Sequence, residues 1–502
     1  MKRSKFSLSN YKVCTLNGGY LVPIGIFDVL PGDTIQMATS ALVRAQPLET
    51  PVMHPVHVRI HHWFVPLRLV WDDFQEFITG GEDGFNASVF PTLELSYTNP
   101  TTGDNIVGQL PDYLGVPPNV AFTGDNAVSA LPFRAYNLIF NEWYRDQDLV
   151  TKLAISKASG PDTTTSKLLA RIAWEKDYFT SARPFEQKGP AVTLPLGTSA
   201  PVVRSSMAGN TLVREAGTDN LVTAGVFTAQ SGGEFYANAG GQPELSIDPN
   251  GTLYTDLSGA SAANVNDLRE AFAIQRFEEA RARYGSRYTE YLRYLNVRSS
   301  DARLQRPEYL GGGKQTLQFS EVLQTAEGED TPVGEMRGHG INATRSNRFR
   351  RFIEEHGFVI SMMSIRPRTM YVQGLNRLWN RRTKTDFWQK ELQHIGQQPV
   401  LNKEVYVNAS DPDAVFGYQD RYDEYRRIPN TVAGEMRTTV ADQWHMARIF
   451  SSEPALNASF VQCDPTTRVF SAGETQDQYV VMAYHQIQAR RLVARTGSSF
   501  IY

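Results

Sequence analysis

Two segments near opposite ends of the chain alternate apolar and polar side chains with a period of two. Residues 56–64 read VHVRIHHWF, and residues 478–487 read QYVVMAYHQI. Successive side chains of a strand point to opposite faces, so such alternation indicates a strand with one buried face. Both segments therefore predict strands of a sheet that packs on a hydrophobic core.

Several other segments have the length and composition of short strands or helices. Further strands are expected at residues 20–24, 34–45, 358–366 and 403–408. Helices are expected at residues 71–80, 133–149 and 266–283, the last capped by Asn266 or Asp267. Many short strands, few helices and long irregular connections predict a mainly β fold, a β-sandwich with large loop insertions.

The overall composition limits the classes of function. With 41% hydrophobic residues and a net charge of −3, the chain is not a coat protein that holds nucleic acid by bulk positive charge. A small basic patch in contact with DNA remains compatible with this balance. Its 38 arginines and 12 lysines favour extensive burial against partners, because Arg is enriched and Lys depleted at protein interfaces.

Two cysteines and the absence of a long apolar run bear on the compartment. Cys14 and Cys463 make neither a disulfide framework nor a zinc motif. No apolar stretch follows the basic start of the chain, and no run approaches the roughly 18 apolar residues of a membrane span. We expect folding in a reducing cytoplasm, without a signal peptide and without membrane insertion.

Residues 198–263 differ from their surroundings. The segment is rich in Ala, Gly, Ser and Thr, holds only eight charged residues and contains the turn sequence Asp248-Pro249-Asn250-Gly251. It also holds apolar side chains, among them Phe227, Phe235 and Tyr236, which a solvated linker would lack. We therefore expect a long surface excursion of short strands and turns rather than a disordered linker.

No residue pattern specifies an enzyme, a cofactor or a metal. His57 and His61 share a strand face but lie about 13 Å apart, and His54 and His62 do not complete a ligand set, so no metal is expected. The Gly311–Lys314 segment lacks the hydroxyl residue after Lys314 that a phosphate loop needs, and a flexible turn is the simpler interpretation. Carboxylates are too numerous for their count to exclude a glycosidase pair.

Arginine and tyrosine interleave between residues 281 and 306. Such a mixture suits either stacking of single-stranded nucleic acid or a protein interface, and the near-neutral charge favours subunit contact. The residues concerned are Arg283, Tyr284, Arg287, Tyr288, Tyr291, Arg293 and Tyr294.

Twelve blocks, in order along nearly the whole chain, resemble the major capsid proteins of microviruses, especially the gokushovirus-like branch. They are YLVPI at 20–24, VLPGDT at 29–34, FVPLRLVWD at 64–72, LPFRAYNLIFNEWYRD at 131–146, DYFTSA at 177–182, QKGPAV at 187–192, LREAFAIQR at 268–276, RYTE at 287–290, LQRPEYLGG at 304–312, QGLNR at 373–377, VLNKE at 400–404 and VFGYQ at 415–419. Residues 198–250 and the C-terminal RTGSSFIY depart from the family pattern.

The resemblance implies a fold, a function and partners. It implies that residues 1–502 form a single eight-stranded viral jelly roll with long insertions. It also implies a structural protein of the virion, not an enzyme, that assembles in the bacterial cytoplasm into a T=1 icosahedral shell around circular single-stranded DNA. The implied partners are about sixty copies of the chain, the DNA, a minor pilot protein, a small basic DNA-binding protein and a host receptor.

Two surfaces are assigned on this basis. The basic residues near both ends of the chain either face the shell interior and neutralise DNA phosphates or form solvated charged tails: Lys2, Arg3, Lys5, Arg490, Arg491 and Arg495. Residues 198–263 are expected to form a protrusion at the three-fold axes for host attachment, with Phe227, Phe235 and Tyr236 joining three copies rather than remaining exposed for contact. The alternatives are a β-sandwich glycoside hydrolase and a receptor-binding spike or lectin module.

Overall fold

The computed structural model describes residues 3–82, 85–190, 192, 265–285, 287–297, 300–325 and 333–495, with six short strands between residues 202 and 255. The chain forms two compact units. One comprises residues 1–186 and 282–502, and the other comprises residues 187–281. Each is described by itself.

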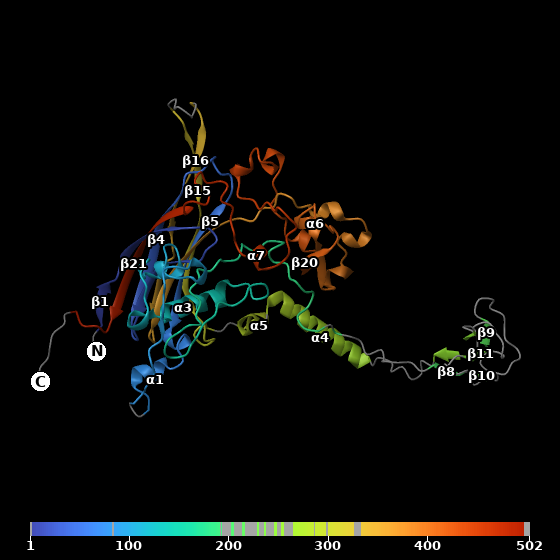
Figure 1. The fold of residues 1–502 in the computed structure, drawn as a ribbon, viewed down its shortest axis with the longest axis horizontal. Helices are drawn as coiled ribbons and strands as arrows, with labels where there is room; N and C mark the ends of the chain where they lie inside the picture. The colour runs from blue at the N-terminus through green and yellow to red at the C-terminus, as the bar shows by residue number, and fades with distance from the viewer. Residues whose placement is uncertain are drawn as a thin grey trace. The chain divides into compact units, whose positions relative to one another are not determined.

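Eight strands of the first unit form the two antiparallel sheets of a jelly roll (Figure 1). The first sheet has the order β2 (Asn10–Leu16), β21 (Tyr479–Arg491), β4 (Thr34–Ala45) and β16 (Met336–Arg345). The second has the order β3 (Val22–Val29), β18 (Gly357–Pro367), β5 (Val56–Pro66) and β14 (Glu308–Thr316). The chain crosses between the sheets at six of its seven connections, which is the jelly-roll topology and confirms the predicted fold class.

Three further strands widen the first sheet. They are β1 (Ser4–Ser7) beside β21, β15 (Gln318–Leu323) beside β16, and β17 (Phe349–Phe352) beside β4. The core lies between the sheets, where Val58 and Ile60 of β5 meet Val481 and Ala483 of β21, all fully buried. This packing explains the period of two in both segments, because the alternate side chains face outward.

Of the four further strand predictions, three are confirmed and one is wrong. Strands occur within or across residues 20–24, 34–45 and 358–366, whereas the strand predicted at 403–408 is wrong. Residues 397–401 form β19 (Gln397–Leu401), paired with β20 (Val415–Asp420), and the chain then turns into the short helix α6 (Asn402–Val405). The Glu404 carboxylate accepts a hydrogen bond from the Leu401 N–H at 3.0 Å, which favours the helical turn over an extended strand.

Two long insertions interrupt the jelly roll. Residues 67–307 separate β5 from β14, and residues 368–478 separate β18 from β21. In the first, α1 (Phe74–Thr79) ends at Gly80 with φ of 85°, as predicted. The predicted helix at 133–149 is shorter: α3 (Leu131–Ile139) continues as one π-helical turn, Phe140–Tyr144, and ends because Arg145 is extended.

The remaining elements of the first unit are short. They are β6 (Thr92–Leu93), α2 (Leu110–Leu114), β7 (Val128–Ser129), α5 (Tyr288–Tyr294) and α7 (Ala458–Val461). Helix α3 covers the outer side of the second sheet, and its Phe133, Tyr136 and Ile139 are buried in one cluster with Trp63 of β5. The first insertion is therefore part of the core rather than a loose loop.

The second unit contains three pairs of short strands. They are β8 (Val202–Arg204) with β13 (Leu253–Thr255), β9 (Val213–Glu215) with β12 (Leu245–Ile247), and β10 (Thr228–Ala229) with β11 (Phe235–Tyr236). Phe227 lies outside the described residues. Helix α4 (Val265–Tyr284) confirms the prediction at 266–283, and because it begins at Val265, the two cap candidates Asn266 and Asp267 lie inside it. Its Phe272 is 59% exposed.

A buried ion pair anchors the first insertion. Arg134 and Asp162 are both fully buried, 2.8 Å apart, and Arg134 also donates to the carbonyls of Val70 and Ala158 at 3.0 Å. We predict that Arg134→Ala lowers the free energy of unfolding by about 3–5 kcal/mol, because it leaves a buried carboxylate without its cation. Chemical denaturation of the purified chain measures this.

The control is Arg68→Ala, which breaks the half-exposed pair with Glu355. Such a pair contributes about 1 kcal/mol or less. Equal losses of unfolding free energy in the two variants would contradict a larger contribution of the buried pair to stability.

Candidate nucleic-acid interface

Besides Arg337, which pairs with Glu49 and Glu335, the outward face of the first sheet carries six cations. We call this the basic face, and its residues are Arg3, Lys5, Arg44, Arg345, Arg350 and Arg490, all exposed. No Asp or Glu occupies an outward position of β1, β2, β4, β17 or β21. Within the described residues, none of the six forms an ion pair. A chain of net charge −3 therefore concentrates unpaired positive charge on one surface.

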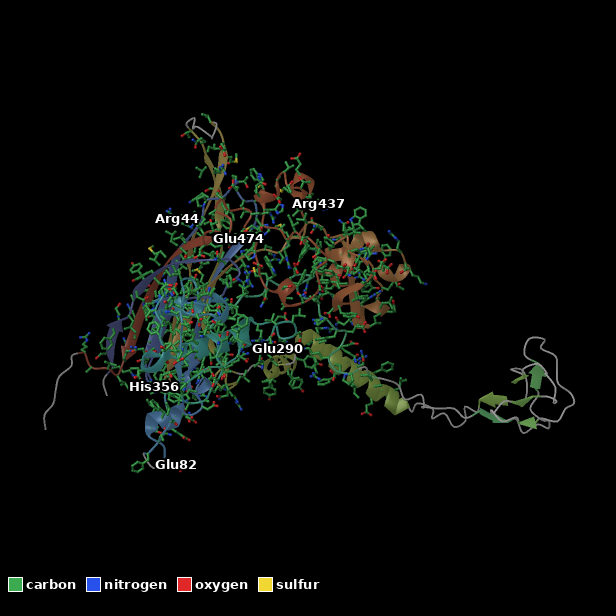
Figure 2. All side chains as sticks on the ribbon, viewed as in Figure 1. Arg44, Glu82, Glu290, His356, Arg437 and Glu474 are labelled. Carbon is green, nitrogen blue, oxygen red and sulfur yellow. The ribbon has the colours of Figure 1, made fainter. Side chains whose placement is uncertain are left out.

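The register of the strands sets the pattern of this face. Lys5 lies opposite Arg490, and Arg490 lies opposite Thr34 of β4. Farther along the same strands, Arg345 lies opposite Ser40, and Arg44 lies opposite Val480. Neighbouring strands are about 4.8 Å apart, so the cations form a grid across the sheet rather than one line. Figure 2 labels Arg44 on this sheet.

Pairing of β1 with β21 brings the two predicted basic clusters together. The N-terminal Arg3 and Lys5 lie beside the C-terminal Arg490. The Arg3 guanidinium donates to the Thr34 hydroxyl at 3.3 Å and lies 5.0 Å from the centre of the Phe352 ring. Lys2 lies outside the described residues. The sequence treated these clusters as separate, because nothing in it revealed that the first and last strands are neighbours.

The other two predicted residues have different surroundings. Arg491 is half-buried and binds the fully buried Asp33 carboxylate at 2.8 Å, and it also donates to the Asp28 carbonyl. Its charge is therefore neutralised within the fold. Arg495 is exposed beyond the end of β21. Their contact with DNA stays a prediction.

Sequence reasoning missed Arg44, Arg345 and Arg350. Each lies in a strand at an exposed position, and the alternation in residues 34–45 was a signal for Arg44. No local pattern, however, identifies which strands share a sheet. The three residues join the basic face only through pairings of β4 with β16, β17 and β21.

Aromatic rings accompany the cations. Tyr11 of β2 and Tyr484 of β21 stack with centroids 4.5 Å apart, and Tyr11 is 67% exposed. Phe352 adds a third ring, 47% exposed, next to Arg3. Cations that bind phosphates, with rings on which bases stack, are what single-stranded nucleic acid binds without sequence preference.

The interleaved Arg/Tyr residues are divided between internal contacts and surface. Arg283 pairs with Asp420 at 3.2 Å, and Arg287 donates to the Asn141 carbonyl at 2.7 Å. Tyr284, Tyr288, Tyr291 and Tyr294 are 40–67% exposed, and the Tyr284 and Tyr294 rings lie 5.2 Å apart. Arg293 lines a 860 Å³ pocket with Trp143 and Arg306. Arg283 and Arg287 therefore stabilise the fold, whereas the four tyrosines remain available for contact with a partner.

A second group of cations surrounds Glu175 on the outer side of the second sheet. The Glu175 carboxylate lies 2.7 Å from Arg59, 2.9 Å from Lys314 and 3.0 Å from Arg368, with Arg366 at 3.9 Å. Burial alone would raise its pKa, but the Lys314 hydrogen bond and the charges of Arg366 and Arg59 bring the pKa down to about 2. Glu175 is therefore ionised at neutral pH and joins strands β5, β14 and β18 of the second sheet to the first insertion.

The Gly311–Lys314 segment is part of β14, which contradicts both a phosphate loop and the expected flexible turn. A side chain on Gly312 would meet the Ile60 carbonyl at 2.3 Å, and one on Gly313 would meet the Arg345 carbonyl at 2.5 Å. The glycines thus permit close packing of strands, and Lys314 forms an ion pair with Glu175.

The histidines are structural. His62 is hydrogen-bonded to the Ser361 and Ser346 hydroxyls at 2.8 and 3.0 Å, and His61 to the Tyr144 hydroxyl at 2.6 Å. Burial lowers the pKa of His61 to about 4 and that of His62 to about 3, so both are neutral at physiological pH. Over the part of the chain that the structure describes, no group of His, Cys, Asp or Glu is arranged to hold a metal ion.

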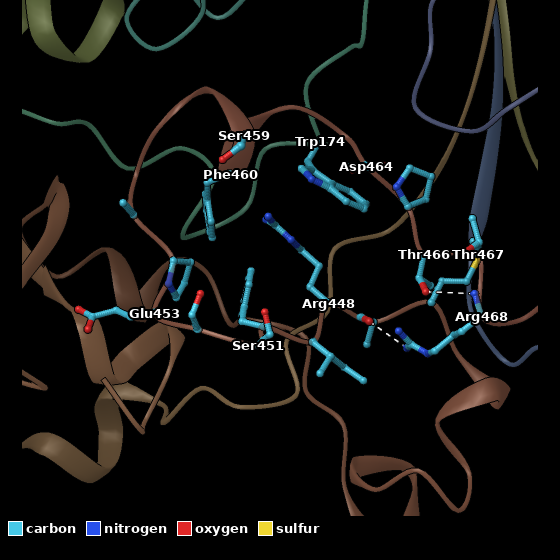
Figure 3. Close-up of a pocket in the computed structure, with 18 of the residues that line it drawn as sticks. Trp174, Arg448, Ser451, Glu453, Ser459, Phe460, Asp464, Thr466, Thr467 and Arg468 are labelled. Atoms are coloured by element: carbon cyan, nitrogen blue, oxygen red, sulfur yellow. Dashed lines mark hydrogen bonds between the residues drawn. The ribbon is translucent and has the colours of Figure 1, made fainter. Parts of the chain in front are cut away.

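A pocket of 680 Å³ in the second insertion is built around Arg448 (Figure 3). Its guanidinium lies 4.2 Å from the Phe460 ring centre and 5.2 Å from that of Trp174. The Glu453 carboxylate binds the Ser410 hydroxyl at 2.7 Å and the Asn402 amide at 2.5 Å. The Arg448 guanidinium packs among aromatic rings although its Nη1 has no hydrogen-bond partner among the described residues, and the Glu453 carboxylate joins two loops, so both groups serve packing.

Comparisons with known proteins match these observations. The family model described as "Capsid protein (F protein)" matches residues 1–500. The chain is 40% identical to "Capsid protein VP1" of Bdellovibrio phage phiMH2K, over 92% of this chain and 88% of the relative. It is 32% identical to "Capsid protein VP1" of Chlamydia phage 1, over 95% and 92%, and 31% identical to that of Spiroplasma virus 4, over 92% and 88%.

No helix among the described residues has the length and apolar character to cross a membrane.

The Glu175 cluster predicts an acid-dependent stability. The folded pKa of about 2 lies below the ordinary value of 4.5, so the unfolded chain binds the proton first and the stabilisation is lost as the pH falls from 4.5 to 2. Glu175→Gln leaves four cations without their carboxylate. We expect a loss on the order of 3 kcal/mol in the free energy of unfolding at pH 7, shrinking below pH 4.5.

Denaturant unfolding at several pH values between 7 and 2 measures this difference. The matched control is Glu49→Gln at the exposed pair with Arg337, where little change is expected. A Glu175→Gln deficit that stays constant down to pH 2 would refute the assignment.

Proposed function

Because this chain belongs to the phage capsid protein (F protein) family, we propose that about sixty copies assemble into a closed T=1 icosahedral shell around a circular single-stranded DNA genome. The chain is a structural capsid protein of the virion and not an enzyme. The match over the whole length to capsid proteins, together with the jelly roll, carries the proposal.

A closed shell needs at least two kinds of contact per subunit, because a single two-fold patch closes only a dimer. Each stable contact buries on the order of 1,000 Å² or more. Exposed aromatic side chains occur at several separate places on the first unit, among them Phe85, Tyr288, Trp379 and Trp388. This distribution supports multiple interfaces over a single one.

We infer further that the basic face lines the shell interior and neutralises DNA phosphates. Its six unpaired cations and three exposed or half-exposed rings support contact that is independent of base sequence. The balanced charge of the whole chain is compatible with this, because one face supplies the cations.

The remaining partners follow from the resemblance to microvirus capsid proteins. They are a minor pilot protein, a small basic DNA-binding protein and a host receptor, with assembly in the bacterial cytoplasm. We propose that residues 198–263 protrude at the three-fold axes and bind the host cell. Support comes from the low charge of this segment and from the separate unit formed by residues 187–281. Phe227, Phe235 and Tyr236 are the residues proposed to join three copies.

For the basic face, we predict that replacing Lys5, Arg44 and Arg490 by Gln weakens binding of single-stranded DNA. The loss of three phosphate contacts should lower the slope of log K against log salt by about 2. Titration of labelled oligonucleotides at several salt concentrations measures the affinity and the slope.

The matched control is Lys152→Gln with Lys157→Gln, two exposed cations on the first insertion. This control should leave both quantities unchanged. An unchanged slope in the basic-face variant would remove that face from DNA binding.

For the insertion, we predict that replacing residues 203–250 by a short Gly/Ser linker leaves shells intact but abolishes adsorption to the host. A long surface loop contributes little to the core and its closure entropy depends weakly on length. Electron microscopy counts the shells, and a cell-binding assay measures adsorption. Shells that still adsorb normally would exclude this segment as the attachment surface.

A further inference from the structure

We propose that neighbouring copies of this chain contact each other through two different surfaces of opposite charge. An acidic patch around α1 of one copy would bind a basic patch at residues 378–390 of the next. The inference rests on the proposed shell assembly and adds the residues of one interface. Both patches belong to the first unit.

The acidic patch lies in a part of the sequence without cations. Residues 69–133 contain no Lys or Arg and nine acids, Asp72, Asp73, Glu76, Glu82, Asp83, Glu94, Asp104, Asp112 and Asp125. Asp72, Glu76, Glu82 and Glu94 are exposed, and none of these four forms an ion pair within the described residues. Figure 2 shows Glu82 at the tip beside α1. Lys167 neutralises Asp104 at 3.0 Å, whereas the four exposed carboxylates keep their negative charge unpaired within the described residues.

Apolar side chains surround these carboxylates. Phe77 is 40%, Ile78 53% and Phe90 38% exposed, on and after α1. The Phe77 and Phe90 rings lie 4.7 and 5.5 Å from the ring of Trp71, which is fully buried. The exposed rings are thus held in place by the core before any partner binds, which lowers the entropic cost of association.

The basic patch has the complementary composition. Leu378, Trp379, Phe387 and Trp388 are 51–64% exposed. The cations between and beside them are Arg381, Arg382, Lys384 and Lys390, and within the described residues none of these four forms an ion pair. The segment therefore combines the aromatic residues and arginine that dominate binding energy at interfaces.

Hydrogen bonds fix the backbone of this patch. The Asp386 carboxylate accepts from the N–H groups of Arg382 and Thr383 at 2.8 and 2.7 Å. The Tyr422 hydroxyl accepts from the Gln389 N–H at 3.2 Å. Arg381 lies 4.5 Å from the centre of the Tyr425 ring. The basic patch is as preorganised as the acidic one.

The geometry points to a second copy as the occupant. Helix α1 and the segment near α6 and β20 lie at well-separated positions of the first unit (Figure 1), so they cannot satisfy each other within one chain. The four exposed carboxylates of the acidic patch and the four cations of the basic patch have opposite charges, and within the described residues none of them forms an ion pair. A contact between unlike surfaces is heterologous, and heterologous contacts generate the closed rings from which a shell is built.

Reversal of charge tests this pairing. Glu76→Lys with Glu82→Lys makes the acidic patch positive, and Arg382→Glu with Lys384→Glu makes the basic patch negative. We expect each double variant to form at least about tenfold fewer shells, because like charges then face each other. The chain with all four substitutions should recover shells, because the charges are complementary again.

Electron microscopy counts the shells, and sedimentation velocity measures association of subunits before closure. Thermal unfolding verifies that every variant is folded. Lys152→Glu with Arg303→Glu is the control, which changes two exposed charges outside both patches and should leave assembly unchanged.

The outcomes separate this inference from the proposed function. The proposed pairing is wrong if either double variant assembles normally, or if the fourfold variant does not recover shells. In both cases, shells formed by the unmodified chain still support the capsid function. Failure of the unmodified chain to associate overturns both. If Arg382→Glu with Lys384→Glu reduces DNA binding but not assembly, the basic patch is a DNA contact and the inference is wrong.

Discussion

The insertion of the last strand into the middle of the first sheet is the constraint on which the rest of the structure depends. β21 pairs with β4 on one side and with β1 and β2 on the other, so residues more than 450 positions apart become neighbours. The core between the two sheets is incomplete until β21 is in place, because its side chains Val481, Ala483 and Ile487 are fully or nearly fully buried there. The same pairing creates the basic face, because it brings Lys5 beside Arg490.

Local periodicity predicted much of the fold and little of the site. The alternation in residues 56–64 and 478–487 is set by burial of one face, which each strand records in its own sequence. The sequence of a strand does not show which strands it pairs with, so the positions of Arg44, Arg345 and Arg350 on the basic face were not predicted. The error at residues 403–408 has a similar origin. Val405 is apolar and buried, but the Glu404 carboxylate caps the helical turn at the Leu401 N–H and also binds Arg377, which is distant in sequence.

Charge is segregated in this molecule although its sum is small. The basic face has no outward carboxylate, residues 69–133 have no cation, and four cations share the single carboxylate of Glu175. The last group is internal and stabilises the fold, whereas the basic face and the exposed carboxylates Asp72, Glu76, Glu82 and Glu94 form no ion pairs within the described residues. Unpaired surface charge of one sign lowers the stability of an isolated subunit. We propose that DNA neutralises one of these surfaces in the virion and that neighbouring copies neutralise the other.

We propose that this jelly roll forms a closed shell with the basic face toward the genome. A cryo-electron-microscopy reconstruction of DNA-filled particles assembled from this chain is the decisive experiment. We expect uniform particles of about sixty subunits, with density for nucleic acid against β1, β4 and β21 on the inner surface. Particles in which these strands face outward, or small closed oligomers in place of shells, would contradict it.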